Sequence, residues 1–100
     1  MKVIFSRPAL RELHDAINYY EIEVEGLGSR FKREVDLARK RISIYPFAWP
    51  IEKEDVRKCL LHKFPYKLLY VVHREEIIVL AVAHQHRHPD YWINRRNLED

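Results

Sequence analysis

Glu76-Ile77-Ile78-Val79-Leu80-Ala81-Val82-Ala83-His84 is the most apolar stretch of the chain, with seven consecutive apolar residues at its centre. Such a run is typical of a strand in the interior of a sheet, covered on both faces. Two further β-type runs precede it, at Val56–Lys63 and Tyr66–His73. The connections Phe64-Pro65 and Arg74-Glu75 have the length expected of hairpin turns. The three runs therefore predict an antiparallel meander, with the half-polar Val56–Lys63 near its edge.

Upstream of the meander, the spacing of apolar residues becomes helical. Lys2–Phe5 is short and β-rich, and Ser6 followed by Pro8 is typical of a helix start. Gly26–Ser29, which holds both glycines, separates two segments whose apolar residues recur at steps of three and four. The first segment comprises Leu10, Leu13, Ile17, Tyr20 and Val24, and the second comprises Phe31, Val35, Ala38, Ile42 and Tyr45. We expect two helices joined as an antiparallel hairpin that ends at Pro46.

The length and composition predict one ordered domain covering residues 1–100. Hydrophobic residues make up 47% of the chain, and there are only 2 Gly and 5 Pro. The order strand, helix, helix and three strands predicts an α+β fold, with the helical hairpin on one sheet face and a short C-terminal tail after the meander. Phe47 and Trp49 are expected to cap the edge of the core. A domain of this size leaves little room for an enclosed organic cofactor, so none is expected.

Charge and cysteine content narrow the classes of function. The chain has 18 Lys and Arg against 15 Asp and Glu, and the net charge of +3 favours anionic partners. The single cysteine, Cys59, excludes an intramolecular disulfide and a cysteine-rich zinc site, and it fits a reducing cytoplasm. No apolar run reaches the length of a signal-peptide core or a membrane span, so we expect a cytoplasmic protein that does not enter the membrane.

The stretch from His84 to Arg96 is dense in chemically active groups. It contains His84, His86, His88, Arg87, Arg95, Arg96, Tyr91 and Trp92. Alternate histidines could converge on a metal, but Pro89 implies a turn and Arg87 would repel a cation, so no metal is expected. Arginine, histidine and aromatic rings together favour contact with phosphates and bases. We expect Arg87 and Tyr91 to have this role, and Trp92 to close the core.

A second basic set lies on the predicted meander. Arg57, Lys63 and Lys67 are expected to share one strand alternation or to face it across a turn, with Lys58 on the other alternation. This set could meet the tail and form one basic surface. Together with the tail, it would support a nucleic-acid-binding module without catalysis.

The second predicted helix is also rich in charge. Its basic residues are Arg30, Lys32, Arg33, Arg39, Lys40 and Arg41. Glu34 and Asp36 lie between them, which favours a solvated face over a binding site. Glu52, Glu54 and Asp55 are expected in a loop, as weak candidates for a general base.

The ordered set of these features resembles the RelE/ParE superfamily of bacterial type II toxin–antitoxin toxins. The resemblance spans almost the whole chain and is carried by Tyr19-Tyr20, Val56–Leu61, Phe64–Tyr70, Ile77–Val82, His84–Arg87, Pro89, Tyr91, Trp92 and Arg95. It implies a helical hairpin on an antiparallel sheet and a cognate antitoxin protein whose extended C-terminal segment wraps around the toxin. Two targets occur in the superfamily. RelE-like members are metal-independent endoribonucleases that cut mRNA on the ribosome, whereas ParE-like members poison DNA gyrase and have no hydrolytic site.

For the RelE-like alternative, the resemblance implies individual residue roles. In-line attack of a ribose 2′-OH on the next phosphate needs a proton acceptor, a proton donor and cations around the phosphorus. The implied catalytic residues are Lys67, His84, His86, Arg87 and Tyr91. Of these, Lys67 and Arg87 stand at phosphate-stabilising positions, Tyr91 stands near a base-stacking position, and one histidine would serve as acid or base. Substrate contacts are expected from Arg57, Lys58, Lys63 and Arg95.

Two departures from the RelE-like pattern narrow the choice between targets. Leu60 stands where that pattern has the second of two alternating lysines, and Lys67 replaces an arginine, which removes the bidentate phosphate geometry. The sequence therefore predicts a toxin, with mRNA cleavage on the ribosome only slightly ahead of inhibition of DNA gyrase.

Overall fold

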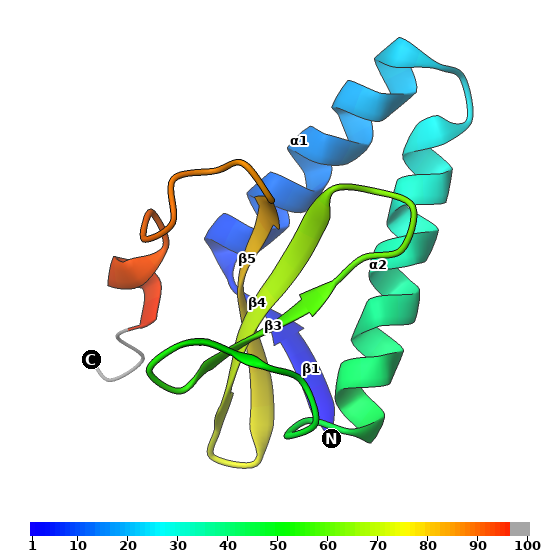
Figure 1. Cartoon of the computed structure of the whole chain (residues 1–100). Helices are drawn as coiled ribbons and strands as arrows, with labels where there is room; N and C mark the ends of the chain where they lie inside the picture. The colour runs from blue at the N-terminus through cyan, green and yellow to red at the C-terminus, as the bar shows by residue number, and fades with distance from the viewer. Residues whose placement is uncertain (97–100) are drawn as a thin grey trace.

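The computed structural model describes residues 1–96, which form two helices and a five-stranded sheet (Figure 1). The elements in chain order are β1 Lys2–Phe5, α1 Arg7–Glu23, α2 Leu27–Ile44, β2 Ile51–Lys53, β3 Val56–Leu60, β4 Tyr66–His73, β5 Glu76–His84 and the 3₁₀-helix η1 Ile93–Arg96. The predicted α+β class is confirmed. Within the described residues, neither helix has the length and apolar character needed to cross a membrane.

β5 lies inside the sheet, as predicted. The strand order is β1-β5-β4-β3-β2, and β5 pairs in parallel with β1 and antiparallel with β4. The helical hairpin packs on one face of the sheet, and the segment after β5 lies on the other face (Figure 1). Burial on both faces explains why the sequence of β5 is almost continuously apolar.

The prediction of a three-stranded meander was wrong in its count and its edge. β2 adds a fourth antiparallel strand beyond β3, and a strand of three residues is too short to show an alternating pattern. The predicted strand Val56–Lys63 ends at Leu60, because Leu61 N–H donates to Tyr66 O at 2.9 Å and begins the turn. Lys63 then takes a positive φ of 70°, which no strand residue adopts.

α1 approaches the sheet through small residues. Ser6 caps the helix, and its hydroxyl accepts a hydrogen bond from Ala9 N at 3.2 Å. Ala9 and Ala16 are the buried residues of α1, two turns apart on one face. Leu13, Ile17 and Tyr20 pack partly against the core, as predicted, but Leu10 and Val24 are exposed. The predicted apolar face was therefore rotated away from the true contact face.

The turn between the helices brings them into close contact. Gly26 has a φ of 87°, the left-handed conformation that favours glycine. A Cβ on Gly28 would lie 2.6 Å from Ile17 O, so no other residue fits there without moving the helices apart. The Glu21 carboxylate accepts hydrogen bonds from Gly26 N at 2.9 Å and Gly28 N at 3.0 Å. These contacts confirm the predicted antiparallel hairpin.

Two apolar clusters lie on opposite faces of the sheet. The first is the core beneath the hairpin, to which α2 contributes Phe31, Val35, Ala38 and Ile42, as predicted. Tyr45 and Phe47 are instead exposed, whereas Trp49 packs against the core edge. The second cluster lies on what we call the tail side of the sheet and comprises Val56, Leu69, Val71, Leu80, Ala81, Ala83 and Trp92.

A β-bulge in β5 places two consecutive residues on the tail side of the sheet. Leu69 pairs with Ala81 and Tyr70 pairs with Val79, so Leu80 is an extra residue in β5. Leu80 and Ala81 both pack in the tail-side cluster. The Leu80 carbonyl accepts hydrogen bonds from the Ser6 hydroxyl at 3.4 Å and the Arg95 guanidinium at 3.1 Å.

Candidate functional site

The tail, residues 85–96, is held on the sheet by a buried aromatic residue. Trp92 is only 1% exposed and packs among the side chains of the tail-side cluster, including Leu69, Leu80 and Ala83. Burial of this indole stabilises the folded state by about 2–3 kcal/mol relative to an exposed side chain. The prediction that Trp92 closes the core is confirmed.

Three ion pairs fix the tail around Trp92. Arg95 Nη1 lies 2.9 Å from Glu12 Oε1, Lys53 Nζ lies 3.0 Å from Asp90 Oδ2, and Arg96 forms a bidentate pair with Asp55 at 2.6 and 2.7 Å. The second and third pairs are open to water, where such pairs contribute about 1 kcal/mol at most. The first pair is mostly buried, with side chains 15% and 22% exposed. The Glu12–Arg95 pair is therefore the main electrostatic anchor of the tail.

Glu12 connects α1, β5 and the tail. Its Oε1 accepts a hydrogen bond from Val82 N at 3.0 Å as well as the one from Arg95. This role is not predicted by the sequence, because Glu12 lies between the apolar positions of the first helical segment, where a side chain is expected to face water. The available signal was its position between Ala9 and Ala16, the small residues that bring α1 close to the sheet.

Arg87 and Tyr91 form a stacked pair on the tail. The Arg87 guanidinium carbon lies 4.0 Å from the centre of the Tyr91 ring, and that of Arg95 lies at 5.0 Å. Burial raises the pKa of Tyr91 above its ordinary value of 10, and the nearby Glu12 carboxylate raises it further. Tyr91 is therefore a neutral ring that supports the exposed Arg87 as a fixed cation on the surface.

The tail histidines lie close together without forming a metal site. The His84 and His86 rings are 5.3 Å apart, and His84 Nδ1 accepts a hydrogen bond from His86 N at 3.1 Å. The Tyr66 ring packs edge-on against His84 at 5.1 Å. Within residues 1–96, no group of His, Cys, Asp and Glu side chains is arranged to hold a metal ion. His84, beside Arg87, lines a shallow cleft of about 280 Å³ between α1 and the end of β5.

The basic residues of the meander divide between the two faces of the sheet, which corrects the prediction. Residues opposite one another on paired strands share a face, and Lys67 is opposite Leu60 whereas Arg57 is opposite Tyr70. Lys58, two residues before Leu60, therefore shares the tail side with Lys67. Arg57 lies on the helix-covered face, where it donates a hydrogen bond to Trp49 O at 2.7 Å.

Glu52 pairs with Lys67 and lies near Lys58, the two lysines of the tail side. Its Oε1 lies 3.1 Å from Lys67 Nζ and 3.8 Å from Lys58 Nζ. Glu52 was predicted in a loop, but it belongs to β2, a strand too short to show an alternating pattern. Between Lys67 and Arg87 there is a cavity of only about 10 Å³. This volume admits about one water molecule.

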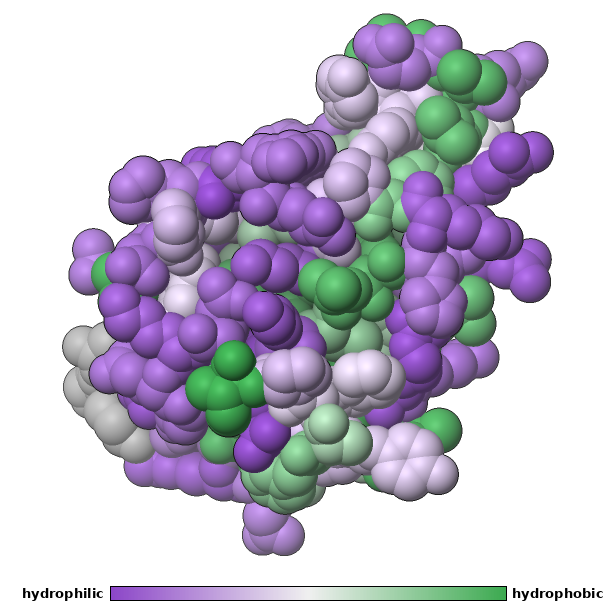
Figure 2. All heavy atoms as spheres, viewed as in Figure 1, coloured by the Kyte–Doolittle hydropathy of each residue, from purple (hydrophilic) through white to green (hydrophobic). Residues whose placement is uncertain are grey.

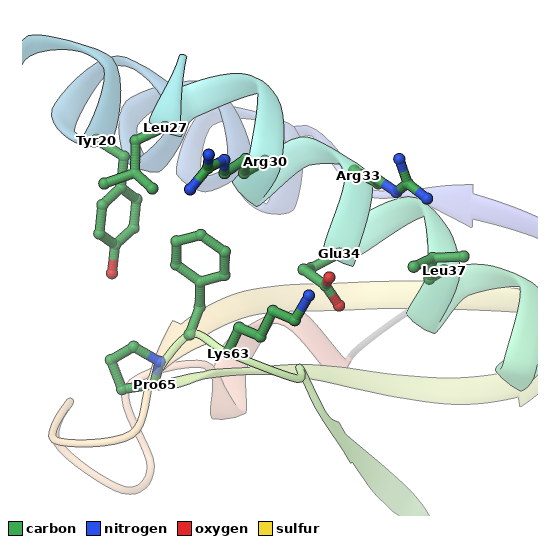
Figure 3. Close-up of a pocket in the computed structure, with 9 residues that line it drawn as sticks. Tyr20, Leu27, Arg30, Arg33, Glu34, Leu37, Lys63 and Pro65 are labelled. Carbon is green, nitrogen blue, oxygen red and sulfur yellow. The ribbon is translucent and has the colours of Figure 1, made fainter. Parts of the chain in front are cut away.

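Lys63 lines a larger opening, in which no tail residue takes part. A groove of about 770 Å³, which we call the α2 groove, runs between α2 and the turn after β3, and its lining comprises Tyr20, Leu27, Arg30, Arg33, Glu34, Leu37, Lys63, Phe64 and Pro65 (Figure 3). Apolar surface runs down the middle of the molecule beside α2, with hydrophilic surface on both sides (Figure 2). Arg30 and Arg33, predicted on a solvated face, are therefore rim residues of a groove.

Comparison with known proteins agrees with this fold. The family model described as ParE toxin of type II toxin–antitoxin system, parDE, matches residues 3–89. A solved structure titled "Chromosomal ParDE TA system from P. aeruginosa" superposes with a TM-score of 0.63 at 19% identity, over 84% of this chain and 95% of that chain. A search among curated protein sequences finds no match.

The fold and the family match define a small toxin that is paired with an antitoxin. The chain belongs to the ParE toxin family of type II toxin–antitoxin systems, within the RelE/ParE superfamily. Membership implies an antitoxin as partner.

Proposed function

We propose that this protein inhibits bacterial growth by acting on DNA gyrase and does not cleave RNA. The observation that supports the proposal is the state of the tail side, where Glu52 pairs with Lys67 and lies near Lys58, and where only about 10 Å³ of free volume separates Lys67 from Arg87. Hydrolysis of RNA would need a phosphate within hydrogen-bond reach of free cations, an acid and a base. Leu60 also lacks the positive charge of the lysine that stands at this position in the RelE-like pattern.

The tail is better suited to contact a protein. Arginine and tyrosine are enriched among the residues that dominate binding energy at protein interfaces. Arg87 is exposed but held on the Tyr91 ring, so little conformational entropy is lost when a partner contacts it. We therefore assign the contact with gyrase to the tail, around Arg87 and Tyr91, and the site of action to the cytoplasm.

The test follows synthesis of DNA and of protein after induction without the antitoxin. Thymidine and amino-acid incorporation are measured separately in one culture during the first minutes. We expect thymidine incorporation to stop first, and purified protein to inhibit supercoiling by purified gyrase. If amino-acid incorporation stops first and mRNA is cut on ribosomes, the alternative of an mRNA interferase holds and Lys67, His84, His86 and Arg87 regain their catalytic roles. If neither stops, the protein has no toxin activity.

Arg87→Ala combined with Tyr91→Ala is expected to abolish growth inhibition. The matched control is Arg39→Ala, because Arg39 is also an exposed arginine but lies on α2, away from the tail. Circular dichroism checks that both variants are folded. Full toxicity of a folded double variant would exclude the tail as the site of target contact.

A further inference from the structure

Glu34 is an acidic residue in an unusual position. It is 6% exposed and lies on the buried face of α2, between Phe31 and Ala38, and its Oε1 is buried with no hydrogen-bond partner among residues 1–96. A buried carboxylate oxygen without a partner destabilises the protein unless another group donates a hydrogen bond to it. Glu34 therefore marks a point where the free protein is incomplete.

The side chain faces the α2 groove. Its carboxylate points toward Lys63 across the opening (Figure 3), but the Lys63 ammonium is not within the 4.0 Å that defines an ion pair. Lys63 belongs to an exposed turn, where its backbone has a positive φ of 70°. A ligand that enters the groove meets the Glu34 carboxylate from the side that faces Lys63.

The rest of the groove indicates the shape and charge of a ligand that would fit it. Its apolar wall is formed by Tyr20, Leu27, Leu37, Phe64 and Pro65. Arg30, Arg33 and Lys63 place three positive charges around the rim, and among the residues 1–96 none of them forms an ion pair. The groove therefore complements a segment that is apolar on one side, acidic at its margins, and able to donate a hydrogen bond at one central position.

We infer that Glu34 selects the antitoxin: the antitoxin segment that fills the α2 groove inserts one lysine or arginine that pairs with the Glu34 carboxylate, while acidic residues flank it opposite Arg30, Arg33 and Lys63. This inference rests on the toxin–antitoxin part of the proposed function and does not depend on which target the toxin poisons. A basic residue in an otherwise acidic segment would fix the register of the segment, because only one position finds a buried negative charge.

The test measures the affinity between the purified toxin and its purified antitoxin by calorimetry. Glu34→Gln keeps the shape of the side chain and removes the charge, and we expect it to weaken binding by at least about tenfold. Glu34→Lys should weaken binding much further. Arg39→Glu is the matched control, because Arg39 is exposed on the same helix but does not line the groove, and its effect should stay within about twofold.

A charge exchange identifies the partner residue. Each lysine and arginine of the antitoxin is changed in turn to glutamate and tested against Glu34→Lys toxin. We expect one of these changes to recover at least tenfold in affinity with Glu34→Lys toxin while weakening binding to the unmodified toxin. Circular dichroism shows whether each variant is folded. If Glu34→Lys toxin is not folded, the conclusion rests on the affinity of Glu34→Gln toxin.

Three results would overturn the inference. Unchanged affinity of Glu34→Gln toxin would show that Glu34 has no partner on the antitoxin, and would leave the assignment to gyrase intact. Self-association of the toxin that Glu34→Gln abolishes, with unchanged affinity for the antitoxin, would assign the groove to a second copy of this chain. A toxin that forms no complex with the antitoxin would contradict both this inference and the toxin–antitoxin pairing, whatever the gyrase assay shows.

Discussion

The tail side of the sheet and the α2 groove use their charges in opposite ways. On the tail side, Lys67, Arg95 and Arg96 are each paired with a carboxylate of another segment, and the cavity between Lys67 and Arg87 holds about one water molecule. In the α2 groove, about 770 Å³ is open, and Glu34 Oε1 has no hydrogen-bond partner among residues 1–96. Folding pairs these tail-side cations and leaves Arg87 exposed on the Tyr91 ring, whereas the α2 groove keeps an open volume beside a buried carboxylate oxygen. Residue type alone would not separate them, because both surfaces are rich in lysine and arginine.

The largest expected effect comes from removing the residue that closes the tail side. Trp92→Ala should lower the free energy of unfolding by about 3–5 kcal/mol, because it leaves a cavity in a well-packed cluster. Chemical denaturation measures the change. Phe47→Ala, which alters an exposed ring, is the control and should change stability by about 0.5 kcal/mol or less. A similar small change for Trp92→Ala would show that the tail is not packed on the sheet.

The next effect concerns the anchor of the tail. Glu12→Ala removes the acceptor of hydrogen bonds from Val82 N and Arg95, and it should lower the free energy of unfolding by about 2 kcal/mol. Glu12→Gln keeps an acceptor oxygen and should recover part of the loss. Amide hydrogen exchange of Val82 checks the mechanism, since its protection should fall in Glu12→Ala and stay higher in Glu12→Gln. Equal protection in both variants would contradict the anchor role.

The alkaline limb of the stability curve should report the burial of Tyr91. Its pKa is raised in the folded protein, so the unfolded chain loses the phenol proton first, at its ordinary pKa of 10. The stability contributed by the neutral phenol is complete below pH 10 and is lost as pH rises above it, by about 1.4 kcal/mol per pH unit. Tyr91→Phe lacks this titration. Denaturation between pH 9 and 12 should give a shallower decline for Tyr91→Phe, and parallel curves would contradict the burial.

The smallest effect on stability is expected at Glu52. Glu52→Ala frees Lys67 and Lys58. The Glu52–Lys67 pair is about as buried as the Glu12–Arg95 pair, but within residues 1–96 Glu52 lacks the backbone hydrogen bond that Glu12 accepts from Val82 N, so the free energy of unfolding should fall by only about 1 kcal/mol. Non-specific binding of single-stranded RNA should become tighter and more dependent on salt, because two cations become available. Fluorescence anisotropy at two salt concentrations measures this change. RNA cleavage by this variant would show a nuclease site that Glu52 suppresses.

Those elements that depend on local spacing could be read from the sequence. β5 is a continuous apolar run, and Gly26 and Gly28 mark the turn of the helical hairpin, so neither needs information from distant residues. The parallel pairing of β1 with β5 and the three-residue β2 leave no such local pattern. They depend on which strands meet when the whole sheet assembles.

The site residues were harder to predict for a related reason. The tail was singled out by its composition, and Trp92 was correctly assigned to the core. Glu12 and Glu52 were missed because their partners, Arg95 and Lys67, lie 83 and 15 residues away in the chain. Glu34 was read as part of a solvated face, because the sequence shows that a residue is charged but not whether the folded chain offers it a counter-ion.

The parallel pairing of β1 with β5 has a consequence for the order of folding. β1 is the first strand to be synthesised, yet its neighbour in the sheet ends only at His84. The helical hairpin makes local contacts and can form early, whereas β1 stays unpaired until β5 is made. The tail can dock only after that, because its receptors on α1 and β5, Glu12 and the bulged Leu80, are brought together by the closed sheet. The nascent chain therefore acquires the surface assigned to its target as its last step of folding.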